Sequence, residues 1–91
     1  MNDLQSGTGD KTLLLSLEQM RADIAAMVHE DPEEIRLDDN LMDLGLDSMR
    51  VMSLLERWGR QGVVLDFSRI AEHLTLEGWW KLAREAQGVA D

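Results

Sequence analysis

The sequence predicts an all-α domain, a small bundle of four helices, on two observations. In four separate segments, apolar residues recur at the three- and four-residue spacing of an amphipathic helix. The stretch that most resembles a strand, residues 62 to 66, has no second strand with which to pair, and a lone strand is not stable. We therefore expect three longer helices, a short third helix, and a long loop between the first two.

The chain of 91 residues has room for one domain. Its first eleven residues are polar and contain glycine, which is typical of a loose tail. We expect a flexible N-terminal tail over residues 1 to 11, the folded domain over 12 to 88, and a short C-terminal tail over 89 to 91.

The first helix is predicted over residues 13 to 29. It has an alternative start at Ser16, which can form a capping box with Gln19. The apolar positions that share one face of this helix are Leu13, Leu17, Met20, Ile24, Met27 and Val28.

A long connection follows over residues 30 to 46. Asp31 and Pro32 can start a short helical turn within it, since proline suits the first helical position. Five apolar residues are spaced as anchors that hold this loop on the bundle, and a long ordered loop in a small domain is often functional. The anchors are Ile35, Leu37, Leu41, Leu44 and Leu46.

The second helix is predicted to begin at Asp47 or Ser48 and to end near Arg60, with Gly62 as its stop. Its apolar residues have the spacing of a buried face. They are Val51, Leu54, Leu55 and Trp58.

Two further helices are predicted, with Asp66 and Thr75 as their N-caps. The third covers residues 67 to 74, and its inward positions are Phe67, Ile70, Ala71 and Leu74. The fourth runs to about residue 87 and is ended by Gly88, with the inward positions Leu76, Trp79, Trp80 and Ala83. We expect the tryptophans to pack in the core rather than to stack on a ligand.

The composition excludes several classes of function. A formal net charge of -9 argues against nucleic acid and anionic membranes as partners, and it suits either partners with basic surfaces or simple solubility. Without cysteine, the chain has no disulfide, no thiolate nucleophile and no cysteine-based zinc site. It also lacks a stretch of membrane-spanning length and an N-terminal secretion signal, so we expect a cytoplasmic protein.

Neither a catalytic triad nor a metal site fits the sequence. His29 and His73 are isolated from one another, and no Gly-x-Ser-x-Gly motif is present. Acidic residues gather between 38 and 47, but the alternate positions after Asp38 do not follow the ligand pattern of a calcium-binding loop.

Ser48 has two interpretations. It can be an ordinary residue in the first turn of a helix that Asp47 caps. Alternatively it is a point of modification, because a phosphate ester on its oxygen would lie at the positive end of the helix dipole. Met49 and Met52 flank it on the side away from the core, where methionine suits an adaptable docking patch, although single exposed methionines are common.

Residues 41 to 58, LMDLGLDSMRVMSLLERW, resemble the phosphopantetheine attachment region of acyl and peptidyl carrier proteins. The match centres on Asp43, Gly45, Leu46, Asp47 and Ser48, and the likeness extends over about residues 13 to 87. It implies a four-helix carrier-protein bundle with a long first loop. Within the family, GLDSMRVMSLLERW and VLDFSRIAEHLTLEGWWKLA are similar to the aryl carrier attached to isochorismatase in catecholate siderophore assembly.

The chain departs from amino-acid carriers, which often have His-Pro-Thr before the last helix, since it has Leu74 between His73 and Thr75. It contains no isochorismatase region, so we expect either a free-standing carrier or an excised one.

The resemblance implies a carrier with no catalytic site of its own, which acts as a monomer. A phosphopantetheinyl transferase would move 4'-phosphopantetheine from coenzyme A onto Ser48. An aryl-AMP ligase would load an aryl acid of the 2,3-dihydroxybenzoate or salicylate type as a thioester, and a condensation or other downstream synthetase domain would receive it. The product class would be a nonribosomal peptide or siderophore.

The resemblance also implies roles for the neighbours of Ser48. Asp47 and Asp43 would contact the transferase or its metal-bound coenzyme A. The ligase and downstream domains would meet Met49, Met52 and Arg50, and the exposed side of the third helix, with Arg69, would contribute a further contact. The alternatives are an acyl or amino-acid carrier on the same fold, or an acidic helical adaptor that is never modified.

Overall fold

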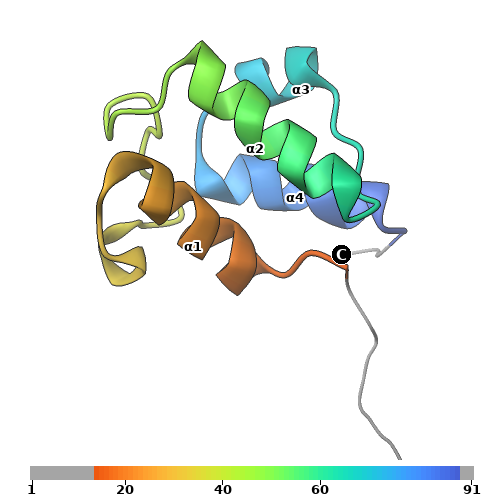
Figure 1. Cartoon of the computed structure of the whole chain (residues 1–91), viewed down its shortest axis with the longest axis horizontal. Helices are drawn as coiled ribbons and strands as arrows, with labels where there is room; N and C mark the ends of the chain where they lie inside the picture. Colours follow the sequence, from red (N-terminus) through yellow and green to blue (C-terminus); the bar gives the residue numbers. More distant parts are fainter. Residues whose placement is uncertain (1–13, 89–91) are drawn as a thin grey trace, which may run out of the picture.

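The computed structural model describes residues 14 to 88 and shows an all-α fold (Figure 1). Three longer helices and one short helix are present, and the described residues form no strand beyond an isolated bridge between Asn40 and Thr75. The predicted fold class is therefore confirmed. The helices are α1 (Leu17–Val28), α2 (Ser48–Arg60), α3 (Phe67–Glu72) and α4 (Leu76–Ala86), with a 3-10 turn η1 (Pro32–Glu34) in the long loop.

Helix α1 begins at the alternative start. The Ser16 hydroxyl accepts a hydrogen bond from the backbone N–H of Gln19 at 3.1 Å, and residues 14 and 15, which precede it, are not helical. The earlier start at residue 13 and both predicted tails, 1 to 11 and 89 to 91, lie outside the described residues. The helix ends at Val28, one residue before the predicted end, because the left-handed backbone of its C-cap His29 (φ 62°) stops the helical repeat.

The other predicted helix starts are confirmed by their caps. The carboxylates of Asp47 and Asp66 accept from backbone N–H groups at the starts of α2 and α3, and the hydroxyl of Thr75 does the same for α4. At the other end of α2, Gly62 has φ 101°, as a helix stop requires. The short turn at Pro32 is also confirmed.

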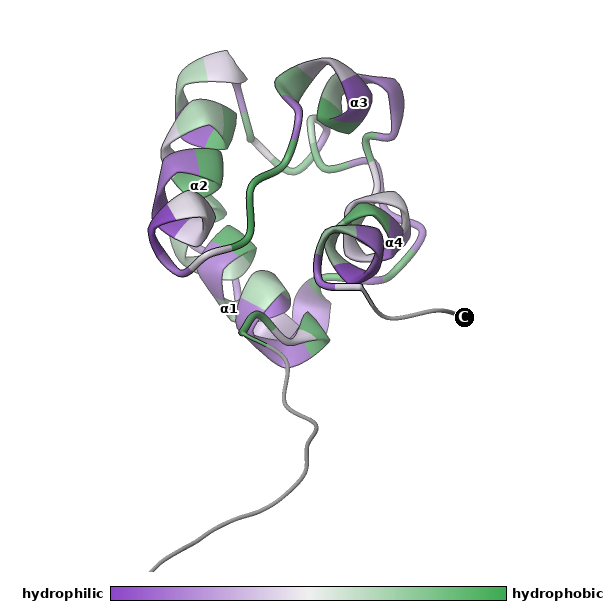
Figure 2. Ribbon diagram, turned by 90° about the vertical axis from the view of Figure 1, so that its right-hand side faces the viewer, coloured by the Kyte–Doolittle hydropathy of each residue, from purple (hydrophilic) through white to green (hydrophobic). Residues whose placement is uncertain are grey.

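The core fills the space between the helices, and Figure 2 shows the hydrophobic faces turned toward that space. The rings of Trp58 and Trp79 meet edge to face, with centroids 6.3 Å apart. The indole N–H of Trp58 donates to Asp23 at 2.8 Å, and that of Trp79 donates to the carbonyl of Ile70 at 3.1 Å. The predicted core role of these two rings is confirmed, because both are fully buried and both polar groups are satisfied.

Trp80 is only partly buried, although it was expected to point inward. Its ring lies 5.7 Å from the guanidinium carbon of Arg84, one turn further along α4. The ring therefore covers the edge of the core and carries a cation on its face.

Three predicted core positions are wrong. Leu37 and Phe67 are each 40% exposed, and Ala71 is also exposed. Helix α3 stops at Glu72 rather than at residue 74, so it has fewer than two turns, and Ile70 is the one residue that it buries fully. Leu37 contributes its backbone instead, because its carbonyl accepts a hydrogen bond from the N–H of Glu77 at 2.9 Å.

The segment over residues 62 to 66 is a loop, as predicted. Val63 is fully buried and its N–H bonds to the carbonyl of Trp58, whereas Val64 is 79% exposed. Figure 2 shows this hydrophobic segment passing between α2 and α3. The loop thus closes part of the core without any strand pairing.

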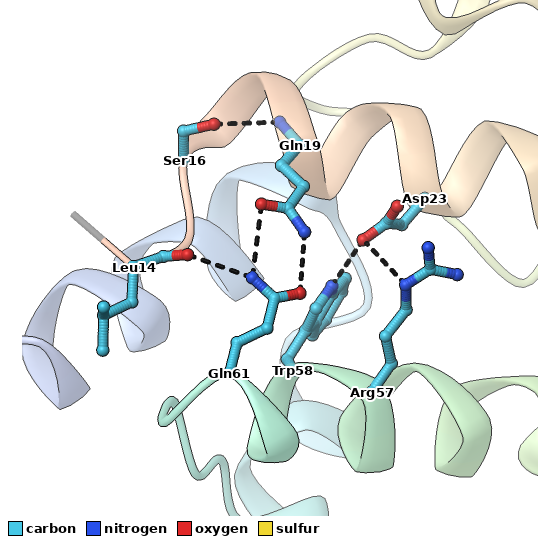
Figure 3. Close-up of polar contacts among 7 residues, drawn as sticks. All are labelled: Leu14, Ser16, Gln19, Asp23, Arg57, Trp58 and Gln61. Carbon is cyan, nitrogen blue, oxygen red and sulfur yellow. Dashed lines mark hydrogen bonds and ion pairs between the residues drawn. The ribbon is translucent and has the colours of Figure 1, made fainter.

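Glutamine side chains fasten the segment before α1 to the ends of two other helices. Gln61 donates to the carbonyl of Leu14 at 3.0 Å and exchanges hydrogen bonds with Gln19 (Figure 3). Gln87 bonds both the N–H and the carbonyl of Leu15, at 3.1 and 2.9 Å. These contacts lie at the C-terminal ends of α2 and α4. In α2 this is the end opposite to Ser48.

Substitution by alanine should have opposite effects on stability at Gly59 and at Gly78. A Cβ atom at Gly59 of α2 would meet nothing within 4 Å, so Gly59→Ala should raise the free energy of unfolding by about 0.5–1 kcal/mol through helix propensity. A Cβ atom at Gly78 of α4 would lie 2.7 Å from the Cβ of His73, so Gly78→Ala should lower it by about 1 kcal/mol or more. Urea unfolding of both variants measures the two signs, and stabilisation by Gly78→Ala would show that the packing of α4 on residue 73 is looser than described.

Candidate functional site

Ser48 is the first residue of α2, and it is exposed. The chain before it is extended at Asp47 (φ -129°, ψ 177°), so the helix begins abruptly at the serine. Backbone N–H groups in the first turn of a helix point toward its start, where the helix dipole is positive. The hydroxyl of Ser48 therefore lies where a negatively charged substituent is electrostatically favoured.

The carboxylate of Asp47 is used twice. One oxygen accepts the backbone N–H of Arg50 at 2.9 Å, and the other pairs with the guanidinium of the same residue at 2.8 Å. Asp47 is thus confirmed as the cap of α2. The structure adds that Arg50 is drawn back against this cap, where it partly neutralises the carboxylate beside Ser48.

Methionine side chains border the serine on the solvent side of α2. Met49 is 80% exposed and Met52 is 55% exposed, as the helical spacing predicted. A shallow hollow of about 320 Å³ lies over this part of the helix, lined by Asp47, Met49, Arg50 and Ser53. The beginning of α2 therefore combines an adaptable apolar surface, formed by Met49 and Met52, with the ion pair between Asp47 and Arg50.

The loop that leads to Ser48 is held at two buried leucines. Leu41 is fully buried and Leu46 nearly so, while Asp43 between them is exposed. Gly45 has φ 118°, a backbone conformation that residues with a side chain rarely adopt, and this allows the chain to turn back toward Leu46. As a result, Asp43 and Ser48 are both presented to solvent from a fixed segment.

Arg69 lies apart from this group. Its guanidinium is 3.5 Å from the carboxylate of Glu85, so it joins α3 to α4. Of the predicted site residues, the structure gathers Asp47, Ser48, Met49 and Arg50 at the start of α2, places Met52 on the same exposed helix, and puts Asp43 on the loop that precedes it.

Two features of the structure were not predicted from the sequence. Phe67 is 40% exposed rather than in the core, because it directly follows the cap of a helix too short to bury both ends. Asn40, which had no predicted role, organises the loop before Ser48 with its side chain. An asparagine at the first position of a turn, where its side chain can accept the backbone N–H two residues further on, is the signal that would have identified it.

Within residues 14 to 88, no three His, Asp or Glu side chains are grouped closely enough to hold a metal ion. Over the same range, no helix is long and apolar enough to cross a membrane.

The family model described as "Phosphopantetheine attachment site" matches residues 18 to 81 of the chain. The chain belongs to this family. It is a phosphopantetheine-dependent carrier protein, and its cofactor is covalent 4'-phosphopantetheine. The residues present fit such a group, because an exposed serine hydroxyl stands at a helix start within the matched region. Carrier proteins of this kind generally have no catalytic activity of their own.

Several curated proteins are similar to this carrier protein. The acyl carrier protein ScoB of Streptomyces coeruleorubidus is 38% identical over 84% of this chain and 89% of its own length. The isochorismatase of Bacillus subtilis is 42% identical over 85% of this chain, but this covers only 24% of that protein. The enterobactin synthase component B of Escherichia coli is 49% identical over 50% of this chain and 16% of its own length.

The predicted likeness to a region of isochorismatase is therefore confirmed, and this chain spans only a small part of the length of these two relatives. No solved structure matches the chain significantly.

The double use of Asp47 predicts a graded effect of its replacement. Asp47→Ala removes both the cap and the ion pair, and it should lower the free energy of unfolding by about 1 kcal/mol. Asp47→Asn keeps an oxygen that accepts the N–H of Arg50 and should lose less than half of that amount. Urea unfolding at low salt measures the difference, and equal losses in the two variants would contradict the capping role.

Proposed function

We propose that this protein is an aryl carrier protein and that Ser48 carries its 4'-phosphopantetheine arm. The observation that carries the proposal is the exposed Ser48 at the capped start of α2, inside the region that the family model matches. When bound, the arm supplies a thiol that holds an acyl group as a thioester. This accounts for a functional protein whose sequence contains no cysteine.

In the modification step, the oxygen of Ser48 forms a bond to the phosphorus of the phosphopantetheine half of coenzyme A. The pyrophosphate P–O bond breaks, and adenosine 3',5'-bisphosphate leaves. The hydroxyl proton passes to a base of the phosphopantetheinyl transferase. This chain contributes the position of the hydroxyl and a helix start whose N–H groups and dipole favour the new phosphodiester.

The neighbours of Ser48 would serve as contacts for partner enzymes. Asp43 and Asp47 suit the transferase or its metal-bound coenzyme A, since both carboxylates are exposed. The exposed Met49 and Met52 suit the ligase and the condensation or other downstream domain. Because Arg50 is already paired with Asp47, a partner that binds one of these charges must also accommodate the other.

Arg69 would be a more distant contact on α3. Its pairing with Glu85 leaves the guanidinium exposed, so a partner carboxylate can approach it. A cytoplasmic location, a monomeric state, and the lack of nucleic acid and membrane partners remain predictions from the sequence.

The proposal of an aryl cargo rests on similarity to a phenyloxazoline synthase, an enterobactin synthase component and an isochorismatase. The phenyloxazoline synthase MbtB of Mycolicibacterium paratuberculosis is 38% identical over 81% of this chain, which corresponds to 6% of that protein. Together with the enterobactin synthase component and the isochorismatase, it supports a cargo of the 2,3-dihydroxybenzoate or salicylate type in nonribosomal peptide or siderophore synthesis. The similarity to ScoB over most of that protein's length supports an acyl carrier as the second candidate.

Intact mass spectrometry tests the attachment. With coenzyme A, magnesium and a broad-specificity phosphopantetheinyl transferase, the protein should gain the mass of one phosphopantetheine, and Ser48→Ala should gain none. A folded wild-type protein that gains no mass would overturn the carrier function.

The same holo protein separates the two candidate cargoes. An aryl-AMP ligase should form a thioester on it, whereas amino-acid and fatty-acyl ligases should load it poorly. Loading by acyl or amino-acid ligases alone would favour the alternative.

Met49→Asp should slow loading by the ligase at least severalfold, because it places a charge in the apolar surface beside Ser48. Val64→Asp is the matched control, since Val64 is 79% exposed and lies on the loop beyond the far end of α2. Circular dichroism checks that both variants keep their helix content. Equal loading rates for the two variants would mean that Met49 is merely exposed.

A further inference from the structure

The side chain of Asn40 organises the loop that precedes Ser48. Its amide oxygen accepts the backbone N–H of Met42 at 2.9 Å and that of Asp43 at 3.3 Å. Its backbone carbonyl also accepts the N–H of Asp43, at 3.0 Å. Asn40 is exposed and packs no core, so the contribution of its side chain is this turn.

The same point of the loop is fastened to the junction between α3 and α4. The N–H of Leu41 donates to the carbonyl of Leu74 at 2.8 Å, and Asn40 forms the isolated bridge with Thr75, the cap of α4. The side chain of Leu41 is fully buried. The turn at Asn40 therefore begins at a point of the loop that is held against the start of α4.

From this point a short series of turns leads to the serine. The N–H groups of Leu44 and Leu46 both donate to the carbonyl of Leu41, at 3.2 and 3.3 Å. Leu46 is buried, and Asp47 is the one residue between it and Ser48. The positions of Asp43 and Ser48 relative to each other thus depend on how the chain turns at Asn40.

We propose that Asn40 is a positioning residue for the modification of Ser48, an inference that rests on the proposed carrier function. Its amide oxygen sets the turn that places Asp43 at a fixed distance from Ser48, so that one transferase surface meets both. Without this acceptor, the N–H of Met42 turns to water, the N–H of Asp43 keeps only the backbone carbonyl of Asn40, and the exposed part of the loop loosens. The buried Leu41 and Leu46 keep the helix bundle folded. What is lost is the fixed position of Asp43 relative to Ser48.

The transferase reaction tests this role in three variants. Asn40→Ala should lower kcat/KM for phosphopantetheine transfer roughly fivefold, the ratio that corresponds to the loss of one hydrogen bond, and mainly through KM. Asn40→Asp keeps an acceptor oxygen and should stay within about twofold of the wild type. Ser16→Ala is the matched control, because it also removes a side-chain oxygen that accepts one backbone N–H, but at the start of α1.

Hydrogen exchange gives a readout that does not depend on the transferase. In the unmodified protein, the backbone amide of Met42 should exchange roughly five- to tenfold faster in Asn40→Ala than in the wild type. Its exchange rate should be unchanged in Asn40→Asp and Ser16→Ala.

An unchanged kcat/KM in Asn40→Ala would overturn the positioning role. An equal loss in Ser16→Ala would overturn it as well, because the effect would then be one of stability. If the wild-type protein itself gains no phosphopantetheine, the proposed function fails and this inference fails with it.

Discussion

The edge-to-face contact between Trp58 and Trp79 joins all four helices at one place. Trp58 belongs to α2 and its indole N–H bonds Asp23 of α1, while Trp79 belongs to α4 and its indole N–H bonds the backbone of α3 at Ile70. Large aromatic side chains contribute most to a small core, provided that their polar groups are satisfied. Most of the remaining core is aliphatic and packs around this pair, so the orientation of each helix depends on it.

This constraint determines where the chemistry can occur. Trp58 lies ten residues beyond Ser48 along α2, about 15 Å at the rise of an α-helix. Trp58 thus anchors the far half of α2, while Ser48 and Met49 at its start are exposed and suit the proposed arm and partner contacts. Leu14, just before α1, is fastened to Gln61 at the far end of α2, away from Ser48.

Local sequence signals predicted most of the fold but only part of the site. Caps such as Asp47 and Asp66 were predictable because each acts within three residues of its own position. Phe67 was wrongly assigned to the core, because periodicity cannot show that α3 ends after six residues. At the site, the exposure of Ser48 and Met49 followed from helical spacing, whereas the sequence could not show that the loop at Asn40 is fastened by the hydrogen bond between the N–H of Leu41 and the carbonyl of Leu74. Such a contact between distant segments leaves no local pattern.

The central claim is that Ser48, and no other hydroxyl group, carries the arm. Trypsin cleaves after Arg36 and Arg50, which releases residues 37 to 50, a peptide whose one hydroxyl side chain is Ser48. Tandem mass spectrometry of the digested holo protein should place the phosphopantetheine on this peptide. Its presence on residues 51 to 57, which contain Ser53, or on any other peptide would contradict the assignment.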